Sequence, residues 1–216
     1  HDAPSPSTYV GGMALLHAAT LTPTKIELMT RWAPTQPWGP PIDAPLQALG
    51  AFRFDDPSGE VGIETHIVGV GTDVWQIPLT YRAAPLDGAD HALAGQMEHS
   101  ALGTRWVYDG LHDPVYTTML AAVTLTGQGE ALGLVEVEDR WVVAPSTVRI
   151  AGGGWSGGRV PVDGFTVERD DAAGSVLTSD RFRLEVFRRP APGPLPPIAL
   201  TATWHGLRGP VVLAAV

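Results

Sequence analysis

The stretch Gly59–Tyr81, GEVGIETHIVGVGTDVWQIPLTY, decides the fold of this chain. Two runs rich in β-branched and aromatic residues flank the short turn Gly71–Asp73, and this pattern predicts a β-hairpin. In the first run, apolar residues of one face alternate with Glu64 and His66 of the other. The second run carries an apolar row of its own: Trp75, Ile77, Leu79 and Tyr81. Because a lone hairpin is only marginally stable in water, we expect further strands and helices to cover it.

The composition is that of a folded chain with one large domain or two small ones. Its 216 residues are 44% hydrophobic and 17% charged, which predicts a packed core rather than disorder. The net charge of −9 repels phosphate backbones, so nucleic acids and anionic membranes are not expected as partners. Cysteine is absent, which excludes disulfides and thiolate sites and fits a reducing, cytoplasmic location. No apolar run reaches the ~18 residues of a membrane helix, and no signal peptide is recognisable.

Two helices are predicted in the first part of the chain. The first has Thr22 as its cap and Pro23 as its first residue. The second has Asp113 as its cap and Pro114 as its first residue, and it ends at Gly127. Both helices carry apolar side chains at helical spacing, so we expect them to pack on the sheet that contains the hairpin.

After residue 127 only strand and turn patterns occur, so the predicted fold class is α+β, with antiparallel sheets and few helices. We expect two domains, at 13–127 and 128–216. Residues 1–12, rich in Pro, Ser and Gly, are set aside as a disordered tail. Either they derive from cloning and Met13 is the natural start, or they are a processed natural tail. Pro78 lacks an amide hydrogen, so its strand is either an edge strand or turns Pro78 away from its neighbour.

Four motifs follow one another in the first part of the chain. They are KIEL at 25–28, WAPTQPW at 32–38, WQIPL at 75–79 and YDGLHDP at 108–114. In this order they resemble the N-terminal cap of the maltokinases, which phosphorylate maltose with ATP, over about residues 14–125. The resemblance implies a cystatin-like sheet with one or two helices on one face. The matching stretch is similar to the cap variant found in short stand-alone cap proteins, some of which carry an α-glucan branching label.

The segment SDRFRLEVFRR at 179–189 resembles, more weakly, a strand pair of the maltokinase N-lobe, in which a lysine holds the ATP phosphates. Glu185 stands where that lysine should be, and an anion there repels phosphate. The second part of the chain thus resembles a degenerate kinase N-lobe. One arrangement open to its sheet is packing edge to edge with the first sheet. The chain also leaves no room for the catalytic and metal-binding aspartates of a C-lobe, so we expect no kinase activity and no cofactor. Alternatively, Glu185 is an ordinary exposed strand residue.

Two glycine motifs point to other chemistry. Residues 154–158, GWSGG, match the nucleophile elbow of hydrolases, but Pro161 and Gly164 prevent the helix that this motif requires. The pattern G-x-G-x-x-G at 152–157 lacks the βαβ context of a phosphate-binding loop, so a plain glycine loop is favoured. The seven histidines show no paired metal-binding spacing, and no metal site is predicted.

Six residues of the cap motifs are candidates for ligand binding: Trp38, Trp75, Gln76, Tyr108, Asp109 and His112. Four tryptophans, Trp32, Trp38, Trp75 and Trp106, either form a stacking platform for a sugar or belong to the core. His112 either contacts a ligand or serves the structure beside the capping aspartate. One hypothesis is a non-catalytic interaction or regulatory protein related to maltokinase, linked to maltose, trehalose and α-glucan metabolism through a protein of that pathway. The alternative is a small-ligand protein that binds a sugar or a nucleotide. A homodimer is compatible with both.

Overall fold

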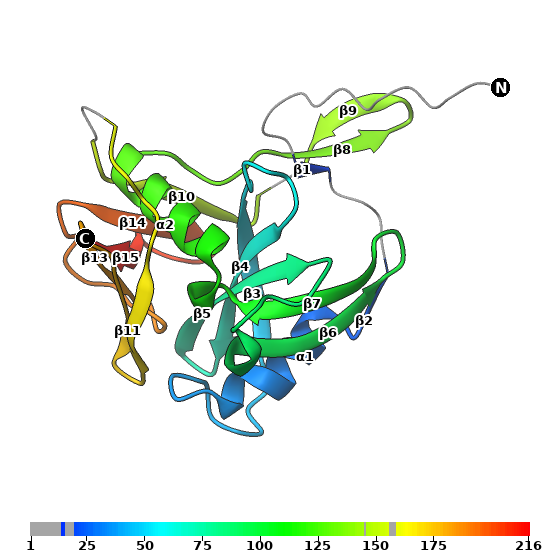
Figure 1. Cartoon of the computed structure of the whole chain (residues 1–216), viewed down its shortest axis with the longest axis horizontal. Helices are drawn as coiled ribbons and strands as arrows, with labels where there is room; N and C mark the ends of the chain where they lie inside the picture. The colour runs from blue at the N-terminus through cyan, green and yellow to red at the C-terminus, as the bar shows by residue number, and fades with distance from the viewer. Residues whose placement is uncertain (1–13, 16–19, 145, 156–158) are drawn as a thin grey trace.

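The computed structural model describes residues 14–15, 20–144, 146–155 and 159–216. Within them it places two six-stranded antiparallel sheets, a small third sheet and two α-helices (Figure 1). The predicted α+β class with few helices is confirmed.

The N-terminal sheet contains the predicted hairpin. Its strand order is β2-β6-β7-β5-β4-β3, with β2 (Leu21–Thr22), β3 (Gln47–Phe54), β4 (Gly62–Val70), β5 (Asp73–Arg82), β6 (Leu93–His99) and β7 (Gly103–Asp109). The hairpin is the β4–β5 pair, in which Val70 pairs with Asp73 across a two-residue turn. Gly71 has a φ of +60° in that turn, a conformation that glycine adopts without steric cost. A short 3₁₀ helix, η2 (Asp90–Ala92), precedes β6.

Both faces of the hairpin are buried, because its strands carry apolar residues on opposite faces. Ile63 pairs with Thr80, whereas Glu64 pairs with Leu79. The apolar row of β5 therefore shares a face with Glu64 and not with Ile63. Helix α1 (Lys25–Trp32) covers the Leu79 face with the side chains of Leu28, Met29 and Trp32.

Helix α1 begins later than the sequence predicts. Thr24 is its N-cap: the Thr24 hydroxyl accepts from the Glu27 amide, and the Glu27 carboxylate accepts from the Thr24 amide. Thr22, the expected cap, instead ends β2 and pairs with Glu98 of β6. The reciprocal bonds satisfy two amide groups at once, which favours Thr24 as the cap. A 3₁₀ turn, η1 (Ala33–Thr35), follows α1.

Helix α2 (Pro114–Thr126) forms as predicted. The Asp113 carboxylate accepts from the Val115 amide at 3.0 Å, and Pro114 occupies the first turn. Gly127 ends the helix in the left-handed conformation, with a φ of +70°. A 3₁₀ turn, η3 (Gly110–His112), links β7 to α2. Among the described helices, none is long and apolar enough to cross a membrane.

The C-terminal sheet follows α2, and no helix occurs after residue 127 in the described ranges. Its strand order is β10-β14-β15-β13-β12-β11, with β10 (Val148–Gly152), β11 (Thr166–Asp171), β12 (Gly174–Thr178), β13 (Arg183–Val186), β14 (Ala199–Trp204) and β15 (Val211–Ala215). The third sheet contains β1 (Ala14–Leu15), β8 (Gly133–Val137) and β9 (Arg140–Val143), and β1 pairs with β8 in parallel.

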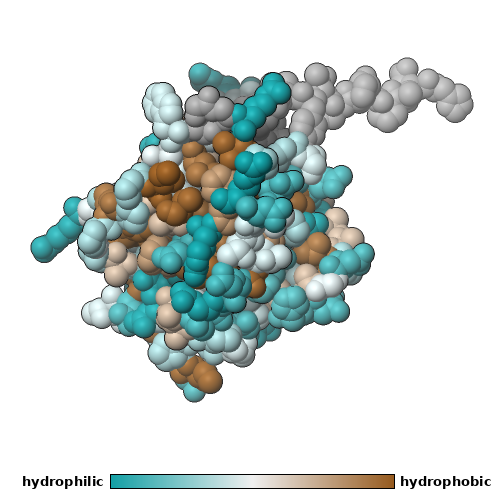
Figure 2. Space-filling model, turned by 60° about the vertical axis from the view of Figure 1, so that its left-hand side comes forward, coloured by the Kyte–Doolittle hydropathy of each residue, from teal (hydrophilic) through white to brown (hydrophobic). Residues whose placement is uncertain are grey.

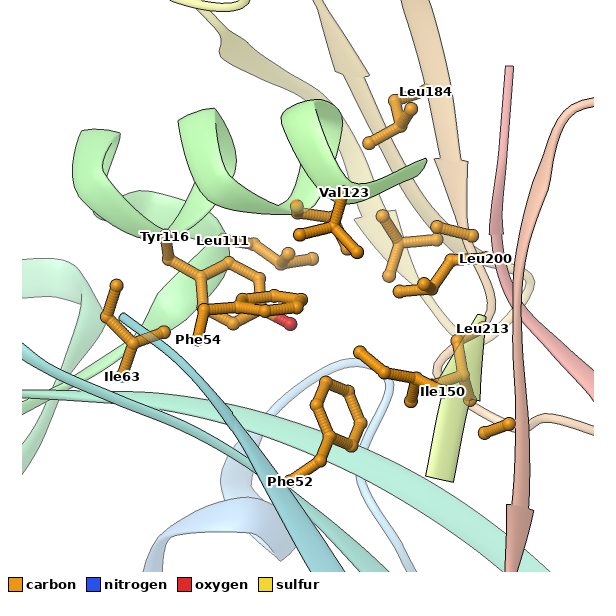
Figure 3. Close-up of a cluster of buried hydrophobic side chains, with 14 of the residues drawn as sticks. Phe52, Phe54, Ile63, Leu111, Tyr116, Val123, Ile150, Leu184, Leu200 and Leu213 are labelled. Carbon is orange, nitrogen blue, oxygen red and sulfur yellow. The ribbon is translucent and has the colours of Figure 1, made fainter. Parts of the chain in front are cut away.

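One buried cluster joins both large sheets to α2. Ile63 and Phe54 from the N-terminal sheet, Tyr116 and Val123 from α2, and Leu200 from the C-terminal sheet meet in it (Figure 3). The Phe54 and Tyr116 rings lie 5.9 Å apart. The core therefore crosses the predicted boundary near residue 127, and the division into two domains stays a prediction.

Candidate functional site

The two large sheets are joined along β5 by the segment that follows β13. The Gln76 amide donates to the Arg188 carbonyl at 2.9 Å. The Gln76 side chain is buried, and its Nε2 donates to the carbonyls of Phe187 at 2.8 Å and Leu213 at 2.6 Å. One glutamine of the N-terminal sheet thus holds two segments of the C-terminal part.

Pro78 lies in the part of β5 that has no pairing with β7. β5 is an inner strand that pairs with β4 throughout, but its ladder with β7 begins only at Leu79. That ladder does not reach Pro78, so the missing amide hydrogen costs no bond to β7. This part of β5 is also where Gln76 meets the Arg188 carbonyl.

Arg188 is the centre of a buried ion-pair cluster at this joint. Its side chain is 1% exposed, and its Nη2 lies 2.7 Å from Asp109 Oδ2 and 3.1 Å from Asp170 Oδ2. Its Nε donates to Ser175 Oγ at 2.8 Å, and the guanidinium lies over the Trp38 ring at 4.0 Å. A buried cation is tolerated only where counter-charges and acceptors surround it. Burial lowers the pKa of Arg188, but the two carboxylates raise it above its usual value, so the side chain stays charged.

The two carboxylates reach Arg188 from different sheets. Asp109 ends β7 and accepts from the Leu111 amide at 3.1 Å, whereas Asp170 lies on β11. Burial raises the pKa of Asp170, but the His112 ring and the Arg188 guanidinium lower it to about 2. Two aspartates and one arginine leave the cluster with one formal negative charge.

Two histidines lie at the edge of this ion-pair cluster. His112 Nδ1 is 3.2 Å from His91 Nε2, and the rings meet edge to face with centroids 4.8 Å apart. The other nitrogen of His112, Nε2, lies 3.7 Å from Asp170 Oδ2. Both rings line a pocket of about 330 Å³, together with Asp113 and Thr166.

The ligating atoms of Asp109, His112 and Asp170 lie within 4.8 Å of one another, a spacing compatible with a metal ion. However, Arg188 bonds both carboxylates, so a cation placed among the three would face a guanidinium at close range. The arrangement fits an ion-paired joint better than a three-ligand metal centre.

Neighbouring motif residues are also bonded within the chain. Arg82 makes two bonds of 2.7 Å to the Asp113 carboxylate, which also caps α2. The Tyr108 hydroxyl accepts from the Leu86 amide at 2.9 Å, and Tyr108 is buried. These contacts give Tyr108 and Asp113, the second aspartate of the YDGLHDP motif, a structural role.

The tryptophans of the predicted sugar platform are buried or half-buried. Trp38 and Trp75 are 2% and 3% exposed, and Trp75 Nε1 donates to the Trp38 carbonyl at 3.2 Å. Trp32 packs edge to face on Trp38, with ring centroids 5.6 Å apart. Trp106 is half-buried in a separate cluster. A sugar cannot stack on rings that the chain itself covers, so the core interpretation fits this structure.

Glu185 is an exposed residue on β13, which lies between β12 and β15. It pairs with Val176 on one side and Ala215 on the other. This placement agrees with an ordinary exposed strand residue. That it marks a former phosphate site stays a prediction.

The comparison with known families identifies one segment of the chain. Residues 32–113 match the family model of the maltokinase N-terminal cap domain. The resemblance predicted from the motifs is confirmed for this cap segment, which contains less than half of the chain. The KIEL motif at 25–28 precedes the match, and Asp170 and Arg188 follow it. No curated protein matches the chain.

The glycine run that begins at the end of β10 packs against the C-terminal end of α2, the helix that follows the cap segment in sequence. The Gly154 amide donates to the Thr124 carbonyl, and the Gly152 amide donates to the Gln128 carbonyl, both at 2.9 Å. A Cβ at Gly152 would lie 1.9 Å from the Val123 carbonyl oxygen, so only glycine fits. The C-terminal end of a helix carries partial negative charge and repels phosphate. The run therefore fits a helix-capping loop, while Ser156 of the hydrolase motif lies outside the described residues.

The sequence reasoning did not find Arg188, Asp170, Ser175 and His91 as members of the joint. Asp109, Gln76, Trp38 and His112 of the cap segment do converge there, as their grouping in motifs suggested. The sequence signal that could have indicated the joint is Arg188 itself, which lies in the FRR end of the segment at 179–189. An arginine directly after a strand ordinarily indicates an exposed side chain, so its burial was not foreseeable from the pattern alone.

Proposed function

We propose that this protein is a non-catalytic interaction or regulatory protein, related to maltokinase through its cap segment and linked to maltose, trehalose and α-glucan metabolism. The observation that carries the proposal is the joint described above. Asp109, Gln76 and Trp38 of the cap segment are buried against Arg188 and its neighbours. Side chains that are used to hold the chain together are not available to a substrate.

The placement of basic residues supports the non-catalytic part of the proposal. Lys25 is the single lysine of the sequence, and it pairs with Glu64 on the α1 side of the N-terminal sheet. Phosphoryl transfer uses a cation that holds the ATP phosphates. On β13, where the resemblance places that cation, the side chain is the exposed carboxylate of Glu185.

Exposed apolar residues on β9 support the interaction part. Trp141, Val142 and Val143 follow one another and are 57%, 47% and 57% exposed. Consecutive strand residues point to opposite faces, so both faces of this β9 strip are partly exposed. Figure 1 shows the β8–β9 hairpin projecting from the two large sheets, and Figure 2 shows hydrophobic residues gathered on one face of the molecule. Exposed apolar surface is a common feature of protein-binding sites, and its presence on β9 supports an interaction role.

The test is affinity capture with two matched variants, because the chain offers two exposed tryptophans. Trp141→Asp changes the β9 strip, and Trp155→Asp changes a side chain that is 94% exposed elsewhere. We expect the wild type and Trp155→Asp to retain an enzyme of maltose, trehalose or α-glucan metabolism from a native extract, and Trp141→Asp to lose it. Binding of the recovered enzyme is then repeated with both proteins purified.

Three outcomes would count against this function. Recovery of no enzyme of that metabolism removes the pathway link, and equal binding by both variants removes the β9 strip as the surface. Transfer of phosphate from ATP to maltose by the purified protein overturns the non-catalytic role. A thermal-shift response to a sugar or a nucleotide would favour the small-ligand alternative instead.

A further inference from the structure

Two imidazole nitrogens face each other at the spacing that a tetrahedral metal ion imposes on its ligands. Nitrogens bound to Zn²⁺ lie ~2.0–2.1 Å from the ion, so two of them in a tetrahedral site are about 3.3 Å apart. His91 Nε2 and His112 Nδ1 are 3.2 Å apart. They come from η2 and η3, two short 3₁₀ turns on either side of the β6–β7 hairpin.

We propose that His91 and His112 form a binding site for a first-row divalent transition metal such as Zn²⁺, with Asp170 as the partner that orients His112. This site differs from the grouping of Asp109, Asp170 and His112 beside Arg188, because it uses the opposite nitrogen of His112 and lies on the pocket side. It does not depend on the proposed interaction role.

Asp170 occupies the place of an orienting carboxylate. Metal-binding histidines commonly direct their second nitrogen at a carboxylate, which fixes the ring and strengthens the ligand. His112 Nε2 lies 3.7 Å from Asp170 Oδ2, and Asp170 is itself held by Arg188 and by the Ser175 hydroxyl. His112 thus has Nε2 toward the Asp170 carboxylate and Nδ1 toward His91.

Charge and space at the site also suit a cation with open positions. The Asp109–Arg188–Asp170 group behind His112 has one formal negative charge, whereas the Arg82–Asp113 pair beside it is neutral. The pocket of about 330 Å³ next to both rings leaves room for solvent or for an anionic ligand on the metal. Imidazole favours Zn²⁺, Cu²⁺ and Ni²⁺ over Mg²⁺ and Ca²⁺.

The test is titration calorimetry of the chelator-treated full chain with Zn²⁺, Ni²⁺ and Mg²⁺ at pH 7.5. We expect one equivalent of Zn²⁺ or Ni²⁺ to bind and Mg²⁺ to give no response. His91→Ala and His112→Ala should each remove this equivalent. Asp170→Asn should weaken it ~10–100-fold, as changes of orienting carboxylates do. Because metal binding requires deprotonated imidazole, affinity should fall between pH 7.5 and pH 5.5.

His205→Ala is the matched control, because His205 is exposed in the turn between β14 and β15. It should bind Zn²⁺ as the wild type does. Since His91 is exposed, His91→Ala should fold normally, which a far-ultraviolet circular dichroism spectrum checks. The absence of a stoichiometric equivalent overturns the proposal. So does wild-type binding by His91→Ala, or an equal loss in the His91, His112 and His205 variants.

Discussion

The guanidinium of Arg188 lies 2.7 Å from the carboxylate of Asp109, although 79 residues separate them along the chain. Asp109 belongs to the YDGLHDP motif of the cap segment, and Arg188 follows β13 of the C-terminal sheet. The cap motif and the C-terminal sheet thus stabilise each other directly. This pair explains why motif residues that were candidates for ligand binding are buried.

Replacing Arg188 by alanine should lower the free energy of unfolding by about 3–5 kcal/mol. The change leaves the Asp109 carboxylate buried without its counter-ion, and breaking a buried pair from one side has this cost. Urea denaturation followed by tryptophan fluorescence gives the value. Arg189→Ala is the control, because Arg189 pairs with Asp73 at 2.8 Å and both side chains are about half exposed. An exposed pair is worth ~1 kcal/mol or less, so equal losses in the two variants would contradict a structural role for the buried cluster.

Replacing Gln76 by alanine should loosen the same joint by about 1–3 kcal/mol. The carbonyls of Phe187, a half-buried residue, and of buried Leu213 both lose the Gln76 donor, and acceptors removed from water and left without this partner have roughly this cost. Gln96→Ala provides the comparison, because Gln96 is an exposed residue of β6. Hydrogen exchange at residues 187–189 should quicken in the Gln76 variant alone. Unchanged exchange there would show that the glutamine does not hold the segment.

Local chemistry made part of this fold predictable. The β4–β5 hairpin and α2 were predicted because a glycine turn, an aspartate cap followed by proline, and a closing glycine act over a few residues. The start of α1 was misplaced because Thr22 and Thr24 are both adequate caps, and the choice depends on Glu27 three residues beyond Thr24.

The joint could not be predicted, because it depends on contacts between distant parts of the chain. Nothing local distinguishes Arg188, which is buried, from Arg189, which is exposed. The spacing of the tryptophans fits a ligand platform and a core equally well, and only packing assigns Trp38 to the core beneath Arg188. Likewise, His91 and His112 lie far apart in sequence without a metal-binding spacing, so their contact appears only in the folded chain.

Replacing Gly152 by alanine should destabilise the protein by ~1–3 kcal/mol or more, because overpacking against backbone has a cost of this size. Its Cβ would lie 1.9 Å from the Val123 carbonyl oxygen, so α2 or β10 must move. Gly193→Ala is the matched control, because a Cβ there meets no atom within 4 Å. Thermal unfolding of both variants measures the difference. If both melt at the wild-type temperature, the glycine run does not pack on α2 as described.

The stability contributed by Asp170 should disappear in acid. Its pKa is about 2 in the folded protein, because His112 and Arg188 outweigh the effect of burial, against the usual value of 3.8. A carboxyl whose pKa is lowered on folding stabilises the protein above the unfolded pKa, and this contribution is lost as the pH falls through the folded pKa. The difference in unfolding free energy between wild type and Asp170→Asn should therefore shrink by about 2 kcal/mol between pH 5 and pH 2. Urea denaturation at each pH tests this, since other carboxylates titrate in both proteins and cancel. A difference that stays constant over this range would mean that Asp170 is not held as an anion by Arg188 and His112.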